Sequence, residues 1–204
     1  VVDSPDGEMF AVGMGGGGGR RIQLYDSDTL EPQASPPSVT QAVTEDGLTA
    51  GDAGLTFAPD GRTLVTATHG PLGPRGRGSV HVWDVVSGRQ IAGPYDAGWL
   101  HGPVAFSPDG KQAAVSGTFA LHVWDISQGM WSGGSSIAED FCRSGVFSPT
   151  EPILAVLTLR GVALRSTETY ELMELLPSGG WDGPRCAAFT SDGRHLVVGQ
   201  WRSD

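Results

Sequence analysis

The sequence predicts an all-β fold of four four-stranded antiparallel sheets and one incomplete sheet. Three observations support this prediction: a short turn motif recurs along the chain, an alternating strand-like segment follows each copy, and one spacing underlies both. The 31 glycines and 14 prolines are distributed among apolar stretches, which favours a turn-rich β protein over a disordered chain.

The turn motif is built around Pro-Asp-Gly. Proline fixes φ for the turn, aspartate hydrogen-bonds to the nearby backbone, and glycine accepts the left-handed conformation that closes a hairpin. The copies are Pro5-Asp6-Gly7, Pro59-Asp60-Gly61, Pro108-Asp109-Gly110, a copy with serine for proline at Ser191-Asp192-Gly193, and a fifth that keeps only Pro149. Apolar residues on both sides of each copy indicate that the turns join β-strands.

The second motif is an alternating segment that follows each turn. Aliphatic residues alternate with larger or polar residues, which is the period of a strand and not of a helix. The segments are Ile22 to Asp26, Val80 to Asp84, Leu121 to Asp125 and Val162 to Arg165. Two of them end in Trp83-Asp84 and Trp124-Asp125, and we interpret all four as third strands in which His81 and His122 are structural.

The spacing of the turns defines the repeat. Pro5, Pro59, Pro108, Pro149 and Ser191 are separated by 54, 49, 41 and 42 residues. With the surplus of the first two intervals assigned to longer connections, the period is about 41 residues, which is the length of a four-stranded propeller blade. Through its Trp-Asp dipeptides and its Phe-x-Pro-Asp-Gly turns, the chain resembles the WD-repeat family over almost its entire length.

The resemblance implies a partial β-propeller with one four-stranded antiparallel blade per repeat. The expected blades cover residues near 1–33, 53–95, 102–138 and 143–178, and an incomplete blade covers 185–200. A closed ring of four blades would leave that last hairpin without a place. Further blades of the same chain are therefore expected.

Composition and charge exclude several classes of function. The formal net charge of −10 disfavours nucleic acid as a partner, and Arg75-Gly76-Arg77 is interpreted as a solvated turn. No apolar run approaches the length of a membrane span, and Cys142 and Cys186 form no metal-binding or disulfide pattern. We therefore expect a cytoplasmic protein without metal, cofactor or catalytic residues.

Two further segments have a simple structural interpretation. The glycines at 13, 15 and 18 match a dinucleotide-binding pattern, but a strand follows instead of a helix, so we expect a flexible loop over Gly15 to Gly19. Glu171 and Glu174 are interpreted as the polar edge of an outer strand, where charges discourage unwanted strand pairing.

The candidate binding face is one end of the repeats. In a meander of four strands, the second-to-third turns and the connections between blades lie at the same end, and all three long insertions fall there. The residues expected at this face are Arg75, Arg77, Tyr95, Trp99, His101, Phe119, Arg160, Trp181, Asp182 and Arg185. Alternatively, Trp99 and Trp181 cap the hydrophobic layer between blades.

The favoured function is a non-enzymatic scaffold or sensor segment that binds another protein or peptide. One alternative is a propeller hydrolase or lactonase, with Asp96, His101 and Asp182 as its isolated candidates at the channel mouth. A third possibility is a regulatory propeller attached to a catalytic domain outside this sequence. Propellers serve many unrelated functions, so the resemblance names no partner.

Overall fold

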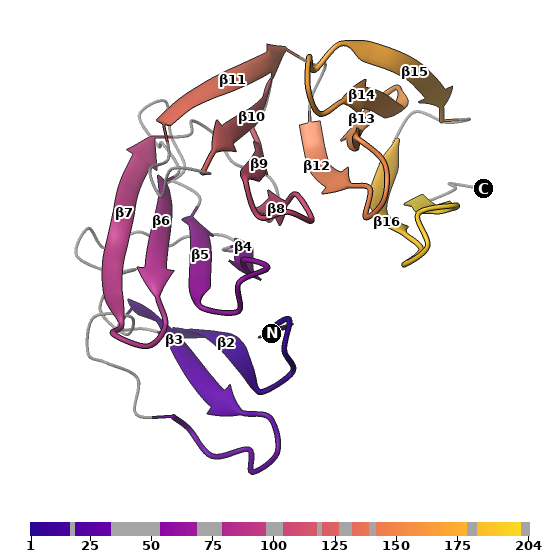
Figure 1. Ribbon diagram of the computed structural model, residues 1–204. Coiled ribbons are helices and arrows are strands. Elements are labelled where there is room, and N and C mark those ends of the chain that lie inside the picture. Colours follow the sequence, from indigo (N-terminus) through magenta and orange to yellow (C-terminus); the bar gives the residue numbers. More distant parts are fainter. Residues whose placement is uncertain are drawn as a thin grey trace. The chain divides into compact units, whose positions relative to one another are not determined.

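The computed structural model describes residues 1–16, 19–33, 54–68, 79–96, 104–117, 120–126, 132–138, 142–178 and 183–200 (Figure 1). Every regular element in these ranges is a β-strand, which confirms the all-β prediction. None of the described residues forms a helix of the length and hydrophobicity needed to cross a membrane. The chain divides into two compact units, Val1–Leu100 and His101–Asp204.

The first unit contains two antiparallel sheets. One has the strand order β1-β2-β3, and the other has the order β4-β5-β6-β7. The strands are β1 (Val2–Asp3), β2 (Met9–Gly16), β3 (Gly19–Asp26), β4 (Gly54–Phe57), β5 (Thr63–Thr68), β6 (Ser79–Asp84) and β7 (Arg89–Asp96). Consecutive strands are neighbours in both sheets, so each sheet is a simple meander.

The second unit contains two four-stranded sheets, β8 to β11 and β12 to β15, and the two-stranded sheet β16-β17. All neighbouring strands are antiparallel. The strands are β8 (Ala105–Phe106), β9 (Gln112–Ser116), β10 (Ala120–Asp125), β11 (Ser132–Ala138), β12 (Cys142–Phe147), β13 (Ile153–Thr158), β14 (Gly161–Ser166), β15 (Leu172–Pro177), β16 (Pro184–Phe189) and β17 (Leu196–Gln200).

The first sheet differs from the expectation of four strands over residues 1–33. Its fourth position holds a single bridge between Tyr25 and Pro32, flanked by a hydrogen bond from Gln33 N–H to Leu24 O at 2.9 Å. Proline has no N–H to donate to a strand ladder, which limits pairing at Pro32 within the described residues. The expected loop over Gly15 to Gly19 is also wrong at Gly15, Gly16 and Gly19, which lie in the ends of β2 and β3; Gly15 pairs with Arg20, and Gly16 pairs with Gly19.

Three of the turns between first and second strands share one hydrogen-bonding pattern. In the first, Gly7 N–H donates to Ser4 O at 2.9 Å, and Asp6 Oδ1 accepts from Ser4 Oγ at 2.5 Å and from Glu8 N–H at 3.1 Å. The turns at Asp109 and Asp192 repeat these bonds. The glycines at 7, 61, 110 and 193 all have φ between 65° and 74°, the left-handed conformation that the motif requires.

The turns between third and fourth strands form a second recurring pattern. The backbone N–H groups of Leu30, Gly88 and Tyr170 donate to the carbonyl four residues earlier, and all three residues are left-handed. The residue after the third strand also donates a hydrogen bond to the carbonyl of the residue just before the second strand. These bonds are Ser27 N to Glu8 O, Val85 N to Arg62 O, Ile126 N to Lys111 O and Thr167 N to Pro152 O, at 2.7–3.0 Å.

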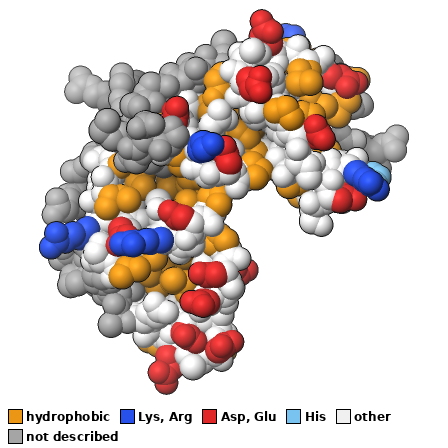
Figure 2. All heavy atoms as spheres, in the orientation of Figure 1, with side chains coloured by type: hydrophobic (Ala, Val, Ile, Leu, Met, Phe, Trp, Pro, Cys, Tyr) orange, Lys and Arg blue, Asp and Glu red, His pale blue; other side chains and the backbone are white. Residues whose placement is uncertain are grey.

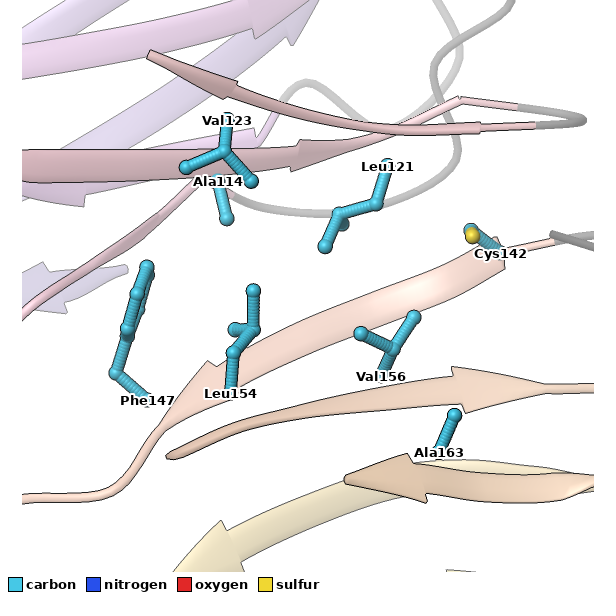
Figure 3. Packing of buried hydrophobic residues seen from close by; sticks show 8 residues of the cluster. All are labelled: Ala114, Leu121, Val123, Cys142, Phe147, Leu154, Val156 and Ala163. Atoms are coloured by element: carbon cyan, nitrogen blue, oxygen red, sulfur yellow. The ribbon is translucent and has the colours of Figure 1, made fainter. Parts of the chain in front are cut away.

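The hydrophobic core lies between successive sheets within each unit. In the second unit, side chains of β9 and β10 face side chains of β12, β13 and β14 (Figure 3). The cluster comprises Ala114, Leu121, Val123, Cys142, Phe147, Leu154, Val156 and Ala163. The first unit has an equivalent cluster of Ala11, Ile22, Leu24, Phe57, Leu64, Trp83 and Val85. Each fully buried leucine contributes about 2 kcal/mol to folding, which is why the alternating strands face one another.

The two Trp-Asp dipeptides lie at the ends of β6 and β10. Trp83 and Trp124 are buried and stack on His81 and His122, with ring centroids 5.9 and 6.1 Å apart. Burial lowers the pKa of His81. The hydrogen bond with the Gln90 side chain raises this pKa, but by less.

Candidate functional site

The register of β12 to β15 brings four positions to one end of this sheet. Cys142 pairs with Thr158, Thr158 with Gly161, and Gly161 with Pro177. The start of β12, the β13–β14 turn and the end of β15 therefore lie together. We call this the connection end of the second unit and define it by Cys142, Leu159–Arg160, Ser178 and Gly183–Pro184. We call the opposite end, which carries Asp109, Glu151 and Asp192, the turn end.

Arg160 is exposed at the connection end, on a tightly bonded turn. Its N–H donates to Thr158 Oγ1 at 3.2 Å, and its carbonyl accepts from Ser178 N–H at 2.9 Å. Thr158 Oγ1, which is buried, donates to Gly161 O at 3.1 Å. Gly161 has φ 146°, and a Cβ there would collide with Leu176 O, so only glycine fits. The turn thus holds the backbone of Arg160 in one position.

Arg185 reaches the same end through the connection into β16. Gly183, with φ 59°, packs so closely on the β13–β14 turn that an added Cβ would lie 2.7 Å from Thr158 O. The register of β16 against β17 then shifts at Arg185, between the pairs Pro184–Gln200 and Cys186–Gly199. An extra residue of this kind re-aims the side chain that it carries. Arg185 is exposed.

Sequence reasoning missed Arg143, which occupies the equivalent place one repeat earlier. Arg143 lies six residues before Pro149, as Arg185 lies six residues before Ser191. The register of β12 against β13 shifts at Arg143, and its side chain is half-buried. Aligning the strands before the two turns would have revealed this pair of arginines.

Carboxylates are distributed unevenly along the described strands of the second unit. The connection end carries Arg143, Arg160 and Arg185. The carboxylates that the structure describes in this unit lie at the turn end or along β15, at Asp109, Asp125, Glu151, Glu168, Glu171, Glu174 and Asp192. At the turn end, the Ser107 hydroxyl and then the Lys111 N–H lower the pKa of Asp109, and the Thr190 hydroxyl and then the Arg194 N–H lower the pKa of Asp192.

Of the other predicted face residues, the structure places Tyr95 by its backbone alone. Tyr95 pairs with Val80 near the end of β7, beside the connection between β5 and β6. Arg75, Arg77, Trp99, His101, Phe119, Trp181 and Asp182 lie outside the described residues. The structure therefore brings Arg160 and Arg185 to one end, and leaves the remainder of the predicted face as a prediction.

The groups suited to catalysis are scattered in the part of the chain that the structure describes. No group of three or more His, Cys, Asp or Glu residues there could hold a metal ion. Asp96, a candidate of the enzyme alternative, ends β7, while His101 and Asp182 lie outside the described ranges.

Comparison with known proteins adds no family. No family model matches the chain, and no curated protein matches it. Its function must therefore be argued from its own residues.

Proposed function

We propose that the chain is a segment of a WD-repeat β-propeller that acts as a non-enzymatic protein-interaction platform in the cytoplasm. The observation that carries the proposal is the hydrogen bond from the residue after the third strand to the carbonyl just before the second strand. It recurs in four successive segments, at Ser27, Val85, Ile126 and Thr167. A recurring bond of this kind is expected when one supersecondary unit is copied end to end.

Packing between successive turns also supports a repeat architecture. In the first unit, a Cβ on Gly61 would lie 3.0 Å from Asp6 Oδ2. In the second unit, a Cβ on Gly193 would collide with Thr150 Oγ1. In both units, the glycine of one turn abuts the residue at the aspartate position of the turn before it. Such neighbour-to-neighbour contact is how repeat proteins bury their cores.

We place the binding face at the connection end because the loops between strands vary in length there, whereas the loops at the turn end have nearly the same length. The β5–β6 connection covers residues 69–78, whereas the β13–β14 turn contains only Leu159 and Arg160. Variable loops on a rigid scaffold commonly carry recognition, and arginine is enriched among the residues that dominate protein interfaces. The acidic composition supports a protein partner over nucleic acid.

The cysteines support the proposed compartment. Neither Cys142 nor Cys186 forms a disulfide. Reduced thiols are the rule in the cytoplasm.

Affinity purification with matched variants tests the proposed binding face. The double substitution Arg160→Ala/Arg185→Ala removes two exposed cations from the connection end, and Lys111→Ala/Arg194→Ala removes two from the turn end. We expect proteins retained by the wild type to be lost with the first variant and kept by the second. Calorimetry with the purified partner should then show affinity reduced about tenfold or more for the first variant.

Circular dichroism provides the control, since both variants alter only exposed side chains and should keep the wild-type spectrum. Equal retention of partners by both double variants would contradict the placement of the binding face. If the wild type retains no protein specifically, the platform function itself is wrong.

A further inference from the structure

The outer strand β15 exposes an unusual amount of apolar surface. Leu172, Met173, Leu175 and Leu176 are 51%, 61%, 41% and 37% exposed, although they belong to a strand of six residues. Figure 2 shows hydrophobic and acidic side chains side by side over this strand. Single exposed apolar residues need no explanation, but a contiguous group of four marks a site of interaction.

Both faces of β15 contribute to this surface. Leu175 pairs with Ala163, which belongs to the buried cluster on one face of the sheet. Leu176 pairs with Val162, which is 3% exposed on the opposite face. Each row of side chains thus runs from buried positions on β14 to open positions on β15. A fifth strand beside β15 would continue and cover both rows at once.

The backbone of β15 offers the means to bind such a strand. In the order β12-β13-β14-β15 it is the last strand, and no strand of the described residues pairs with its outer edge. Unpaired N–H and C=O groups on an edge strand pair readily with an extended peptide. The outer strand β7 is better protected, since its sequence contains Arg89, Gln90 and Pro94.

Charge identifies the kind of segment that fits. Glu168, Glu171 and Glu174 are exposed on β15 and the turn before it, so the expected polar edge is present, although it is interleaved with apolar residues. Arg165 is the one cation in the described strands β14 and β15, and it donates from Nη1 to Tyr170 O at 2.7 Å. A segment with lysine or arginine therefore complements this edge, whereas a second copy of this acidic chain would bring carboxylates together.

We infer that the outer edge of β15 binds an extended segment of another protein that combines aliphatic and basic side chains. Because Pro177 has no N–H, the usable edge is Leu172 to Leu176, a span of roughly 17 Å that matches about five residues of the partner. This inference goes beyond the proposed function and does not depend on it, since the usable edge, Leu172 to Leu176, contains none of the residues placed in the connection-end face.

Labelled synthetic peptides test the inference on the full chain. The probe is a fluorescein-labelled peptide of alternating valine and lysine. One comparison peptide has glutamate for lysine, and another has a central proline that prevents strand pairing. Fluorescence anisotropy should show binding of the lysine peptide, with affinity lower by about tenfold for the glutamate peptide and no binding of the proline peptide. Equal binding of the lysine and proline peptides would contradict the inference that the peptide binds β15 as an added strand.

Variants of β15 locate the site. Glu171→Lys/Glu174→Lys should reverse the preference between the lysine and glutamate peptides, and Leu175→Ser should weaken both, because each change lies on an exposed side chain. Val86→Ser, at a 72% exposed apolar residue in the first unit, should bind as the wild type does. An unchanged charge preference in the double lysine variant, or dimerisation through β15 seen by sedimentation velocity, would overturn the inference.

Discussion

Arg62 Nε donates to Asp84 Oδ2 at 2.5 Å, which ties the β4–β5 turn to the end of β6. The other carboxylate oxygen, Oδ1, accepts from the Ser87 hydroxyl at 2.6 Å and from Ser87 N–H at 2.7 Å. These bonds to Ser87, followed by those to Arg62, lower the pKa of Asp84 from 3.8 to about 2. Asp84 is only 8% exposed, so its charge depends on these partners.

The lowered pKa of Asp84 predicts acid sensitivity in the first unit. The folded state binds the proton less readily than the unfolded state, so the stabilisation is complete above about pH 4 and is lost as the pH falls towards 2. Asp84→Asn should lower the free energy of unfolding at pH 7 by on the order of 1 to 2 kcal/mol, since Arg62 is largely exposed and screened by solvent. Urea denaturation at several pH values measures this.

The difference between wild type and Asp84→Asn should narrow as the pH is lowered from 4 to 2. Asp28→Asn removes an exposed carboxylate from the same unit and serves as the control for net charge. A difference that stays constant over this pH range would show that Asp84 acts through packing and not through its charge.

The turn glycines predict a second effect on stability, in which the cost of backbone conformation can be separated from the cost of a collision. Gly7 and Gly193 share the left-handed conformation, but a Cβ on Gly7 meets no atom within 4 Å, whereas a Cβ on Gly193 collides with Thr150. Gly7→Ala should therefore cost about 1 kcal/mol for conformation alone. Gly193→Ala should cost about 1 to 2 kcal/mol more because of the collision. Hydrogen exchange of β1–β2 and β16–β17 reports the two effects locally.

Thr150→Ala in the background of Gly193→Ala provides the rescue. It removes Oγ1 and Cγ2, which are two of the three atoms that the new Cβ would meet. Protection of β16–β17 should recover in part, and the same substitution beside Gly7→Ala should have no such effect. If Gly7→Ala and Gly193→Ala reduce stability equally, the contact between successive turns does not contribute to stability.

The sequence predicts those parts of the fold whose cause is local. Asp60 illustrates this, because its turn has Ala58 where the other turns have a hydroxyl. Its carboxylate instead accepts from Thr63 N–H at 2.7 Å and Thr63 Oγ1 at 2.7 Å, so the same turn forms with a different partner. Within the described residues, the fourth position of the first sheet holds only the Tyr25–Pro32 bridge. The spacing of the repeat predicted a strand there, but spacing does not reveal that Pro32 lacks the N–H that a strand ladder needs.

The candidate site was less predictable than the fold. Arg160 and Arg185 were selected for exposed positions at one end, and the structure brings them there. The close approach of Gly183 to Thr158 and the register shifts at Arg143 and Arg185 depend on contacts between strands, which one strand's alternation does not reveal. The apolar surface of β15 was missed because its leucines fall on both faces, whereas alternation identifies only one.

The indole of Trp83 predicts a third measurable effect. Trp83 Nε1 donates to Thr66 Oγ1 at 3.2 Å, and both residues are buried. Thr66→Val keeps the shape of the side chain but leaves the indole N–H without its acceptor, which should cost about 1 to 3 kcal/mol. Urea denaturation followed by circular dichroism measures the loss. In the double variant Thr66→Val/Trp83→Phe, the two costs should be less than additive, and additivity would contradict a direct bond.

The two cysteines predict a final contrast, in chemical reactivity. Cys142 is 0% exposed within the core of the second unit, whereas Cys186 is exposed on β16. A thiol reagent should modify Cys186 in the native protein at once, while Cys142 reacts only when the unit opens, which slows labelling about a thousandfold or more for a stable domain. Intact-mass spectrometry should show a single addition, and Cys186→Ser should abolish it. Rapid double labelling without denaturant would mean that the sheets β8 to β11 and β12 to β15 do not seal the core between them.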